Sequence, residues 1–420
     1  MTKSPFVKAG VAAAVAAALV LSAGCSATHD GPPAATAKHS APARHKRPSD
    51  PPVIERPSTV KHWGSFFGAR KGKNYDIQAS PVALTVPGAV AQVGTSNSTE
   101  YVLLTNGTMY AWGLGTHGEL GDGGMVNSMN EPVRVHFPAG VKIAFIPTDV
   151  MPYDTALAVD TQGRVWGWGH NGGGELCLGN TKTYTTPVRL PFSHVTTLAG
   201  ASNHALYDSN GTVYACGQSV DGDLGTGSMS GTTTPMRVHG LEGSSVTDLV
   251  ASFANSGALL SNGTYFDWGY NANGQLGNGL TGPPSDVPVR VALPHPVAQV
   301  ALGGSIWNNG QTIAMLSNGS LWGWGDDWAG QLGDGARTAQ PFPARFLAPA
   351  GVTYQSLATG SATSYAISTT GKVYAWGVGT LGQVGNGATL IAADPVVVAT
   401  HASLISATAN NVLISVPRRK

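Results

Sequence analysis

The chain has few charged residues, and this shortage excludes one class of partner. Charged residues make up 11% of the 420 residues, and residues 61–420 contain 17 Lys and Arg against 20 Asp and Glu. A protein that binds nucleic acid needs a basic surface, because phosphate contacts dominate its affinity. The sequence has no basic stripe, so we expect no nucleic-acid partner.

Catalytic motifs are also lacking, and the abundance of glycine disfavours long helices. The chain contains 56 glycines, and a long helix needs a run without glycine. The Gly-x-Ser-x-Gly, His-Glu-x-x-His, Walker and sialidase Asp-box motifs do not occur. Two matches to the dinucleotide fingerprint, beginning at Gly113 and Gly377, are not followed by the helix that would hold a pyrophosphate. We therefore predict an all-β chain that is not an enzyme and has no cofactor.

No group of side chains in the sequence has the spacing of a metal site. Each Leu-Gly-Asp/Asn-Gly turn offers at most one side-chain ligand, whereas calcium takes six or more oxygens. Asp326 and Asp327 are neighbours in an extended segment, where adjacent side chains point apart. His204 is interpreted as a hydrogen-bonding residue at a strand end rather than a base. We expect no metal.

The N-terminus has the features of an export signal. Lys3 and Lys8 precede a small apolar run that ends at Gly24, which is too short and alanine-rich for a membrane span. Residues 21–25, Leu-Ser-Ala-Gly-Cys, resemble a bacterial lipoprotein box, which implies lipidation of Cys25 and attachment to the outer face of the membrane. The alternative is an ordinary secretory signal that releases the protein.

The segments beside the repeat region are expected to carry little structure. Residues 26–60 are rich in Pro, Ala and Ser and cannot bury enough apolar surface to fold, so we predict a disordered spacer. Residues 417–420 form a short basic tail. Cys177 and Cys216 remain after Cys25, and they occupy different places in different repeats. We expect them to be unpaired, although an oxidising compartment would allow a disulfide.

One phrase recurs along the rest of the chain. Its clearest copy runs from Ser261 through Trp268-Gly269 to Gly279, and the others are centred on Trp63, Trp112, Trp168, Cys216, Trp324 and Trp376. Successive centres are 49, 56, 48, 52, 56 and 52 residues apart. Such a period indicates a repeat architecture, and a length near 50 residues fits a propeller blade of four strands.

Each repeat is parsed into a proline-led strand, a second apolar strand and a hairpin. Pro132, Pro187 and Pro288 begin three of the first strands, because proline is tolerated where its missing donor costs least. The hairpins turn at Asn-Gly or a related pair, such as Asn106-Gly107, which favours a type I′ turn with positive φ at both residues.

The two ends of the repeat region supply half a repeat each. Residues 63–84 contain a late part of the phrase, and residues 403–416 contain only an early part. Together they make one blade, so residues 61–416 are predicted to form a seven-bladed β-propeller closed by pairing of the N- and C-terminal segments. Such closure leaves no exposed sheet edge between first and last repeat.

The phrase resembles the repeat of the regulator of chromosome condensation family. The likeness rests on Tyr-Ala-Trp-Gly followed by Gly-Gln/Glu-Leu-Gly-Asp/Asn-Gly over residues 61–416, although the Trp63 copy lacks Gly-Gln-Leu-Gly. The resemblance implies a seven-bladed propeller. Members have unrelated roles, which include nucleotide exchange on a small GTPase and, in a secreted bacterial inhibitor, binding of β-lactamases, so the fold does not choose a function.

The four variable positions after each Trp-Gly are where we expect function. Equivalent loops of a closed propeller lie on one rim, and aromatic side chains among polar ones are typical of binding hot spots. The predicted partner-binding residues are His117, His170, Tyr270, Asp326 and Trp328.

We predict an exported, monomeric, non-enzymatic propeller that binds a protein through these loops, and the resemblance implies a hydrolase as one class of partner. A binder of cell-wall polysaccharide or peptidoglycan is the alternative, with Trp and Tyr stacking on sugars. A propeller hydrolase or lyase is a third hypothesis.

Overall fold

The computed structural model describes residues 57–417, with gaps at 68–74, 97–98, 148–153, 202 and 305–309. The predicted signal peptide, Cys25 and nearly all of the predicted spacer lie outside the described residues, as do residues 418–420 of the basic tail. Among the described residues, no helix has the length and apolar character needed to cross a bilayer.

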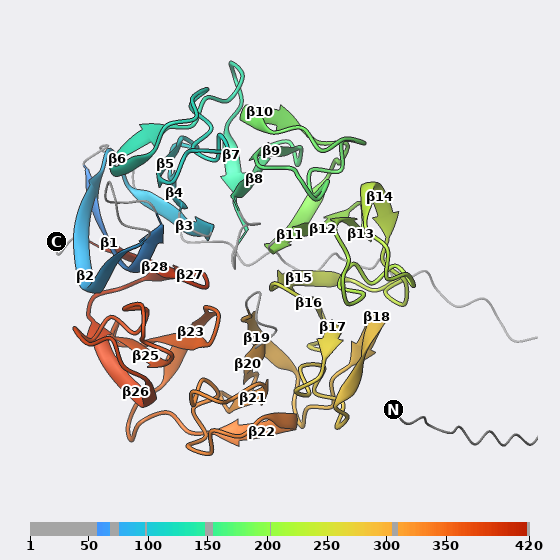
Figure 1. The fold of residues 1–420 in the computed structure, drawn as a ribbon, viewed down its shortest axis with the longest axis vertical. Helices are drawn as coiled ribbons and strands as arrows, with labels where there is room; N and C mark the ends of the chain where they lie inside the picture. Colours follow the sequence, from blue (N-terminus) through green and yellow to red (C-terminus); the bar gives the residue numbers. More distant parts are fainter. Residues whose placement is uncertain are drawn as a thin grey trace, which may run out of the picture. The chain divides into compact units, whose positions relative to one another are not determined.

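The described chain forms seven antiparallel sheets of four strands, arranged as blades around a ring (Figure 1). In each blade the four strands lie side by side, in order from the centre of the ring to its perimeter. The predicted seven-bladed propeller is confirmed. Glycine-rich turns allow it, because each strand must reverse direction within a few residues.

The first two strands of each blade lie nearest the centre. The innermost strands are β3 (Val90–Ser96), β7 (Ile143–Phe145), β11 (Val195–Ala201), β15 (Val246–Ala251), β19 (Val297–Leu302), β23 (Tyr354–Thr359) and β27 (Leu404–Ala407). The second strands are β4 (Thr99–Leu104), β8 (Thr155–Asp160), β12 (His204–Ser209), β16 (Asn255–Leu260), β20 (Gln311–Leu316), β24 (Thr363–Ser368) and β28 (Asn411–Val416).

The third and fourth strands complete each blade on the outside. The third strands are β5 (Met109–Gly113), β9 (Val165–Gly169), β13 (Thr212–Gly217), β17 (Tyr265–Asn271), β21 (Leu321–Gly325), β25 (Val373–Gly377) and β1 (Ser58–Phe67). The outermost strands are β6 (Ser128–Arg134), β10 (Tyr184–Arg189), β14 (Thr232–Arg237), β18 (Gly282–Arg290), β22 (Gln340–Phe346), β26 (Ala392–Ala399) and β2 (Tyr75–Val86).

The ring is closed by both ends of the described chain. The seventh sheet has the strand order β2-β1-β28-β27, in which Trp63 of β1 is paired with Val412 of β28. The prediction that the two half-repeats make one blade is therefore confirmed. Strand β1 begins at Ser58, so the propeller starts slightly before the predicted boundary at residue 61.

The predicted order of strands within a repeat was wrong by one strand. The proline-led strand is the last strand of the blade whose Trp-Gly precedes it, as Val133 of β6 pairs with Ala111 of β5. It therefore lies at the perimeter, where one edge of the strand has no partner in its own sheet. A proline in an outer strand such as β6 is tolerated because this free edge needs no donor.

The hairpin turns also differ from the prediction. Only the turn at Asn210-Gly211 has positive φ at both residues, as type I′ requires. At the other five predicted turns only the glycine has positive φ. At Asn106-Gly107 the Gly107 amide donates to the Leu104 carbonyl, and the Asn106 side chain accepts from the Thr108 amide. Asn-Gly thus forms a longer turn in which glycine supplies the left-handed residue and asparagine the side-chain acceptor.

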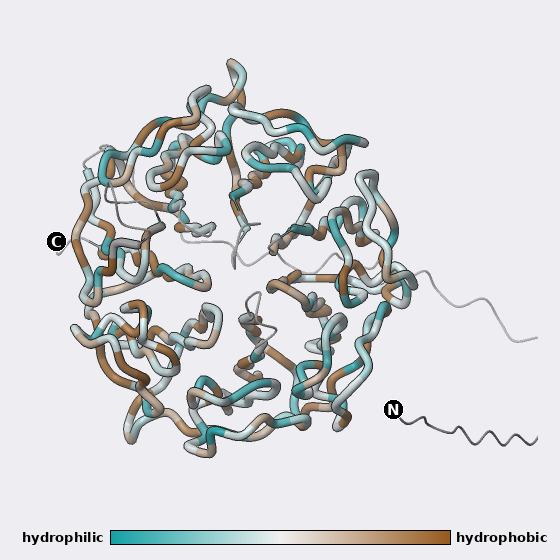
Figure 2. The backbone as a smooth tube through the Cα atoms, in the orientation of Figure 1, coloured by the Kyte–Doolittle hydropathy of each residue, from teal (hydrophilic) through white to brown (hydrophobic). Residues whose placement is uncertain are grey.

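The hydrophobic core lies between neighbouring blades. One cluster joins Tyr101 and Leu103 of the first blade to Ala156 and Trp168 of the second. The six tryptophans that centre the repeated phrase are all completely buried. Figure 2 shows apolar and polar segments alternating around the whole ring. Each blade therefore depends on its neighbours for burial, which a closed ring provides to all seven.

The tryptophan of one blade contacts the Gly-Glu/Gln-Leu-Gly segment of the blade before it. The Trp168 indole donates to the Glu119 carbonyl at 2.9 Å. Gly121 has a positive φ of 66°, and a Cβ there would lie 2.7 Å from the same indole nitrogen. The glycine is needed both for the turn and for the close approach of the ring.

Between the second and third blades a disulfide takes the place of this contact. Cys177 stands where Gly121 stands in the first blade, and Cys216 stands at the tryptophan position. The two cysteines are bonded, with Cα atoms 5.5 Å apart. The expectation that they are unpaired was wrong, because different positions of consecutive repeats are the ones that meet across a blade junction.

Candidate functional site

One rim of the ring carries long connections between the third and fourth strands. Gly113, the end of β5, pairs with Ser128, the start of β6, and with Thr99, the start of β4. The long connections therefore share a rim with the starts of the second strands. The Asn-Gly-type turns between the second and third strands lie on the other rim, called here the hairpin rim. The six connections that the structure describes are residues 114–127, 170–183, 218–231, 272–281, 326–339 and 378–391.

Exposed apolar side chains gather on these connections. Fourteen large hydrophobic residues of the described chain are exposed, and half of them lie in the long connections. These are Met125, Val126, Val220, Met229, Leu280, Trp328 and Leu390. Most of the others are on the outermost strands at the perimeter. A rim lined by separate apolar side chains can bury surface against a partner without being part of the propeller core.

The five predicted partner-binding residues differ in exposure. His117 and Trp328 are about half exposed, and His170 and Tyr270 are partly buried. Asp326 is only 7% exposed. Burial also raises the pKa of Asp326, so this carboxyl is a poorer contact for a partner than its position in the sequence suggested.

The structure brings only some of these residues together. The rings of His117 and His170, from consecutive blades, lie with centroids 5.4 Å apart at an interplanar angle of 72°. Tyr270 is the last residue but one of β17 in the fourth blade, and Asp326 and Trp328 follow β21 in the fifth blade. In Figure 1 the fifth blade lies on the opposite side of the ring from the first two.

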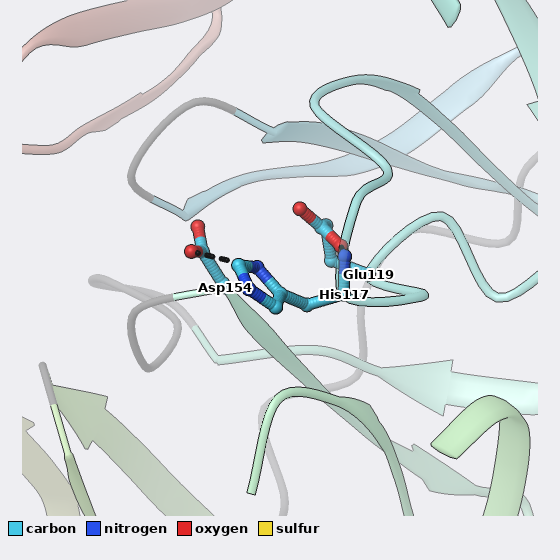
Figure 3. A group of neighbouring side chains, drawn as sticks. All are labelled: His117, Glu119 and Asp154. Carbon is cyan, nitrogen blue, oxygen red and sulfur yellow. Dashed lines mark hydrogen bonds and ion pairs between the residues drawn. The ribbon is translucent and has the colours of Figure 1, made fainter. Parts of the chain in front are cut away.

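Three carboxylates surround the two histidines. His117 Nδ1 lies 3.3 Å from Asp154 Oδ2, and the His117 backbone amide donates to Glu119 Oε2 at 2.6 Å. His170 Nδ1 lies 3.5 Å from Glu175 Oε1. Figure 3 shows the Asp154 and Glu119 carboxylates on either side of the His117 ring. The site thus combines side chains of two blades at the rim.

The electrostatics of this cluster follow from burial. Glu119 is completely buried, and burial together with the Asp154 charge raises the pKa of Glu119 to about 7. The hydrogen bond and charge of Glu175 raise the pKa of His170 above its ordinary value. Among the described residues, no lysine or arginine forms an ion pair with Glu119 or Glu175. The cluster therefore attracts protons or other cations.

The sequence analysis missed Glu119, Asp154 and Glu175, although the repeats contain a signal for two of them. Three later repeats have Gln275, Gln331 and Gln383 at the position of Glu119. The Gln331 side-chain oxygen accepts from the backbone amide two residues earlier, as the Glu119 carboxylate does. A neutral amide is sufficient for this structural bond. The acidic side chains of Glu119 and Glu175 are therefore not required by the fold and indicate an additional role.

A further histidine, His204, lies in a buried Ser-His-Asp arrangement in the third and fourth blades. His204 Nδ1 lies 3.0 Å from Asp223 Oδ2, and His204 Nε2 lies 2.9 Å from Ser256 Oγ. Ser256 is completely buried and donates its proton to the Asp223 carbonyl. His204 must then donate to the serine oxygen, so it is not a base for that hydroxyl.

The same serine bond occurs elsewhere in the ring. Ser364 donates to the Gln331 carbonyl, which also accepts from the Trp376 indole. The Ser256 bond to the Asp223 carbonyl is the equivalent contact, with Trp268 as the second donor. Burial raises the pKa of Asp223, but the charge of His204 and the hydrogen bonds that the carboxylate accepts together outweigh burial and hold that pKa below its ordinary value. The arrangement is a structural junction, in agreement with the predicted hydrogen-bonding role of His204.

Known proteins resemble this chain in sequence. A family model for the regulator of chromosome condensation (RCC1) repeat matches residues 106–146, 162–207, 210–258 and 262–306. The E3 ubiquitin-protein ligase HERC2 of Homo sapiens is 28% identical over 290 residues, which are 67% of this chain and 6% of HERC2. The ultraviolet-B receptor UVR8 of Arabidopsis thaliana is 28% identical over 291 residues, covering 66% of this chain and 62% of UVR8. The chain thus spans less than two thirds of either relative.

Solved structures share the fold at lower identity. Human WBSCR16 superposes with a TM-score of 0.74 and 18% identity, covering 86% of this chain and all of WBSCR16. Prp20p of Saccharomyces cerevisiae gives a TM-score of 0.72 and 20% identity, covering 88% of this chain and 93% of Prp20p. The chain is therefore a closed seven-bladed β-propeller that contains four RCC1 repeats between residues 106 and 306 and resembles RCC1-like propellers.

Proposed function

We propose that this protein is an exported, non-enzymatic propeller that binds another protein through the rim of long connections. The observation that carries the proposal is the concentration of exposed apolar residues on these connections, together with the paired histidines of two blades. Apolar side chains among polar ones are typical of interfaces in which a few anchors supply most of the affinity.

Two related structures favour a protein ligand over a small molecule. Prp20p was studied for its binding to Gsp1p and histones, and it was also crystallised with Kap60. These partners belong to Prp20p. What we transfer to the present chain is the use of a rigid ring as a surface for proteins, because the ring leaves the loops free to vary while the blades keep their packing.

A hollow beside the His170 connection gives the partner a further contact. It has a volume of about 480 Å³ and lies between the second and third blades. Gly173, Gln218, Val220 and Thr233 contribute to its lining. Because Val220 is well exposed, a partner side chain can bury it without disturbing the blade core.

Export is the second part of the proposal. The export signal predicted at residues 1–25 supports it, and so does the Cys177–Cys216 disulfide, since structural disulfides persist in oxidising compartments. We propose that Cys25 is lipidated and holds the protein at the outer face of the membrane. An extracellular hydrolase is the partner class that fits such a location.

The binding surface is tested by alanine substitution on both rims. We expect that His117→Ala, His170→Ala and Trp328→Ala together abolish recovery of the partner after cross-linking on intact cells. Leu347→Ala is the matched control, because Leu347 is an exposed apolar residue just after β22, on the hairpin rim. Full recovery by the triple variant, at an unchanged melting temperature, would show that this rim is not the interface.

The anchor is tested separately. Metabolic labelling with a radioactive fatty acid should mark the wild-type protein and leave Cys25→Ser unlabelled, and globomycin should cause the precursor to accumulate. A wild-type protein that carries no label and appears in the medium would contradict anchoring while leaving export intact.

A cell-wall glycan is the alternative ligand, and the exposed indole of Trp328 is the observation that favours it. Aromatic side chains at a rim can stack on sugar rings. The test is competition, because soluble glycan releases the propeller from wall polymer if sugars are recognised and has no effect on capture of a protein.

A further inference from the structure

Three side chains at the rim present metal-ligand atoms to one another. The group consists of His117 and Glu119 from the connection after β5 and Asp154, which directly precedes β8 in the second blade. One ligand atom of each lies within 4.8 Å of those of the other two. Because Asp154 comes from a different blade, the group forms only when two blades pack together (Figure 3).

The donor types and the distance between His117 and Asp154 fit a small transition-metal ion. In a tetrahedral zinc site, with nitrogen and oxygen ligands about 2.0–2.1 Å from the metal, ligand atoms lie about 3.3 Å apart. His117 Nδ1 and Asp154 Oδ2 are 3.3 Å apart. One imidazole and two carboxylates are ligands suited to zinc and its neighbours in the first transition row, whereas calcium and magnesium take oxygen ligands only.

A buried oxygen atom gives independent support. Glu119 is completely buried, and its Oε1 atom has no hydrogen-bond partner among the described residues, while Oε2 accepts from the His117 amide. The equivalent Gln331 performs the same structural bond in a repeat without a histidine in its loop. An unpartnered buried carboxylate oxygen is costly, and a cation between Glu119 and Asp154 would offset that cost.

We propose that His117, Glu119 and Asp154 bind a divalent transition-metal ion of the zinc class. The half-exposed His117 ring places the ion at the surface, with a fourth position open to water or to a side chain of a partner. His170 and Glu175 lie next to this triad, where the Glu175 carboxylate adds negative charge and His170 adds a second imidazole. The site does not depend on the proposed protein partner, because all three ligands belong to this chain.

The first measurement is metal binding by the purified, metal-stripped protein. Titration with zinc chloride, followed by calorimetry, should show one ion per chain. Cobalt(II) in place of zinc should give the visible absorption bands of a four-coordinate ion, which report ligand geometry rather than activity. Absence of a stoichiometric zinc site in the wild-type protein overturns the proposal.

Variants drawn from the protein's own repeats test the ligands without damaging the fold. Glu119→Gln reproduces the residue of three other blades, and Asp154→Asn reproduces Asn203 of the third blade. Each substitution should weaken zinc binding by more than about 100-fold, since even the loss of an outer-shell partner costs 10–100-fold. The melting temperature of each metal-free variant should equal that of the wild type.

The matched control is an exposed histidine and carboxylate elsewhere in the ring. His239 Nδ1 lies 3.6 Å from Glu242 Oε1, with both side chains well exposed. His239→Ala and Glu242→Gln should leave zinc affinity unchanged. Equal loss of binding in these controls and in Glu119→Gln would show surface adsorption, and unchanged binding in Glu119→Gln would remove Glu119 from the site.

Discussion

Cys177 and Cys216 occupy, in the second and third blades, the two positions at which a glycine and a tryptophan meet at other junctions of the ring. Cys177 has a positive φ of 57°, as Gly121 has a φ of 66° at the equivalent place. Cys216 is completely buried and pairs with Ala205, as Trp168 pairs with Ala156. A covalent bond therefore replaces an indole contact at this junction.

Reduction of this disulfide should lower stability. The bond closes a loop with a sequence separation of 39 residues, for which the chain-entropy model gives about 4 kcal/mol. Thermal unfolding with and without dithiothreitol measures the effect. The double variant Cys177→Gly with Cys216→Trp restores the contact of the other junctions, so its melting temperature should not respond to dithiothreitol. A wild-type protein equally indifferent to reduction would contradict this prediction.

Removal of the Glu100 carboxylate should destabilise the blade junction that closes the ring. Glu100 accepts from the Trp112 indole, which packs against the closing blade, whose Trp63 copy of the phrase has no Gly-Gln-Leu-Gly segment. Its two oxygens also contact His62 of β1 at 2.6 Å and Asn411 of β28 at 3.2 Å. Glu100→Ala leaves these buried groups unpaired, so we expect a loss of about 3–5 kcal/mol in urea unfolding.

The control for Glu100 is the exposed Glu242, which pairs with His239. Glu242→Ala should leave the urea midpoint unchanged. Burial lowers the pKa of His62, but the charge and the hydrogen bond of Glu100 together outweigh burial and raise this pKa above its ordinary value. The pair therefore contributes fully below about pH 6.5, and its contribution is lost as the pH rises through the folded-state pKa. A Glu100→Ala penalty that grows with pH would contradict this assignment.

Asp267 should make stability fall as the pH rises. It is completely buried where the other five complete repeats have Ala or Gly, and burial raises its pKa well above the ordinary value. The unfolded chain loses this proton near pH 4, whereas the folded chain keeps it to higher pH. Stability should therefore decline by up to about 1.4 kcal/mol per pH unit above pH 4 until the folded group ionises.

Asp267→Asn keeps the size of the side chain and removes the ionisation. We expect the variant to gain stability over the wild type between pH 4 and pH 8, with the difference increasing toward pH 8. Urea unfolding at three pH values is sufficient. Parallel pH profiles of the two proteins would mean that Asp267 ionises at the same pH in both states.

Ser256 should behave as a structural residue despite its His204 and Asp223 neighbours. Ser256→Ala and Ser364→Ala each remove one hydroxyl that donates to a backbone carbonyl, so both should cost about 1 kcal/mol in urea unfolding. A fluorophosphonate probe should label neither serine. Labelling of Ser256 alone would revive the hydrolase hypothesis.

The sequence contained enough information for the blade count and the closure. The period of the tryptophans and the half-repeats at 63–84 and 403–416 are local patterns, and any chain that buries such repeats against one another must place them side by side. The turn geometry was not determined by the sequence, because Asn-Gly is compatible with two hairpin types. Pairing of Leu103 with Met109 across β4 and β5 settles where the Asn106-Gly107 turn begins.

The sequence by itself determined the repeating phrase, its strands and the ring that they form, because strand periodicity and turn chemistry act over neighbouring residues. Only the tertiary structure decided which positions of consecutive blades meet. Residues far apart in the chain meet across a blade junction in three places. These are the Cys177–Cys216 bond, the hydrogen bonds of Glu100 to the closing blade and the grouping of His117 with Asp154. The register between blades depends on how their side chains pack, and no spacing along the chain encodes it.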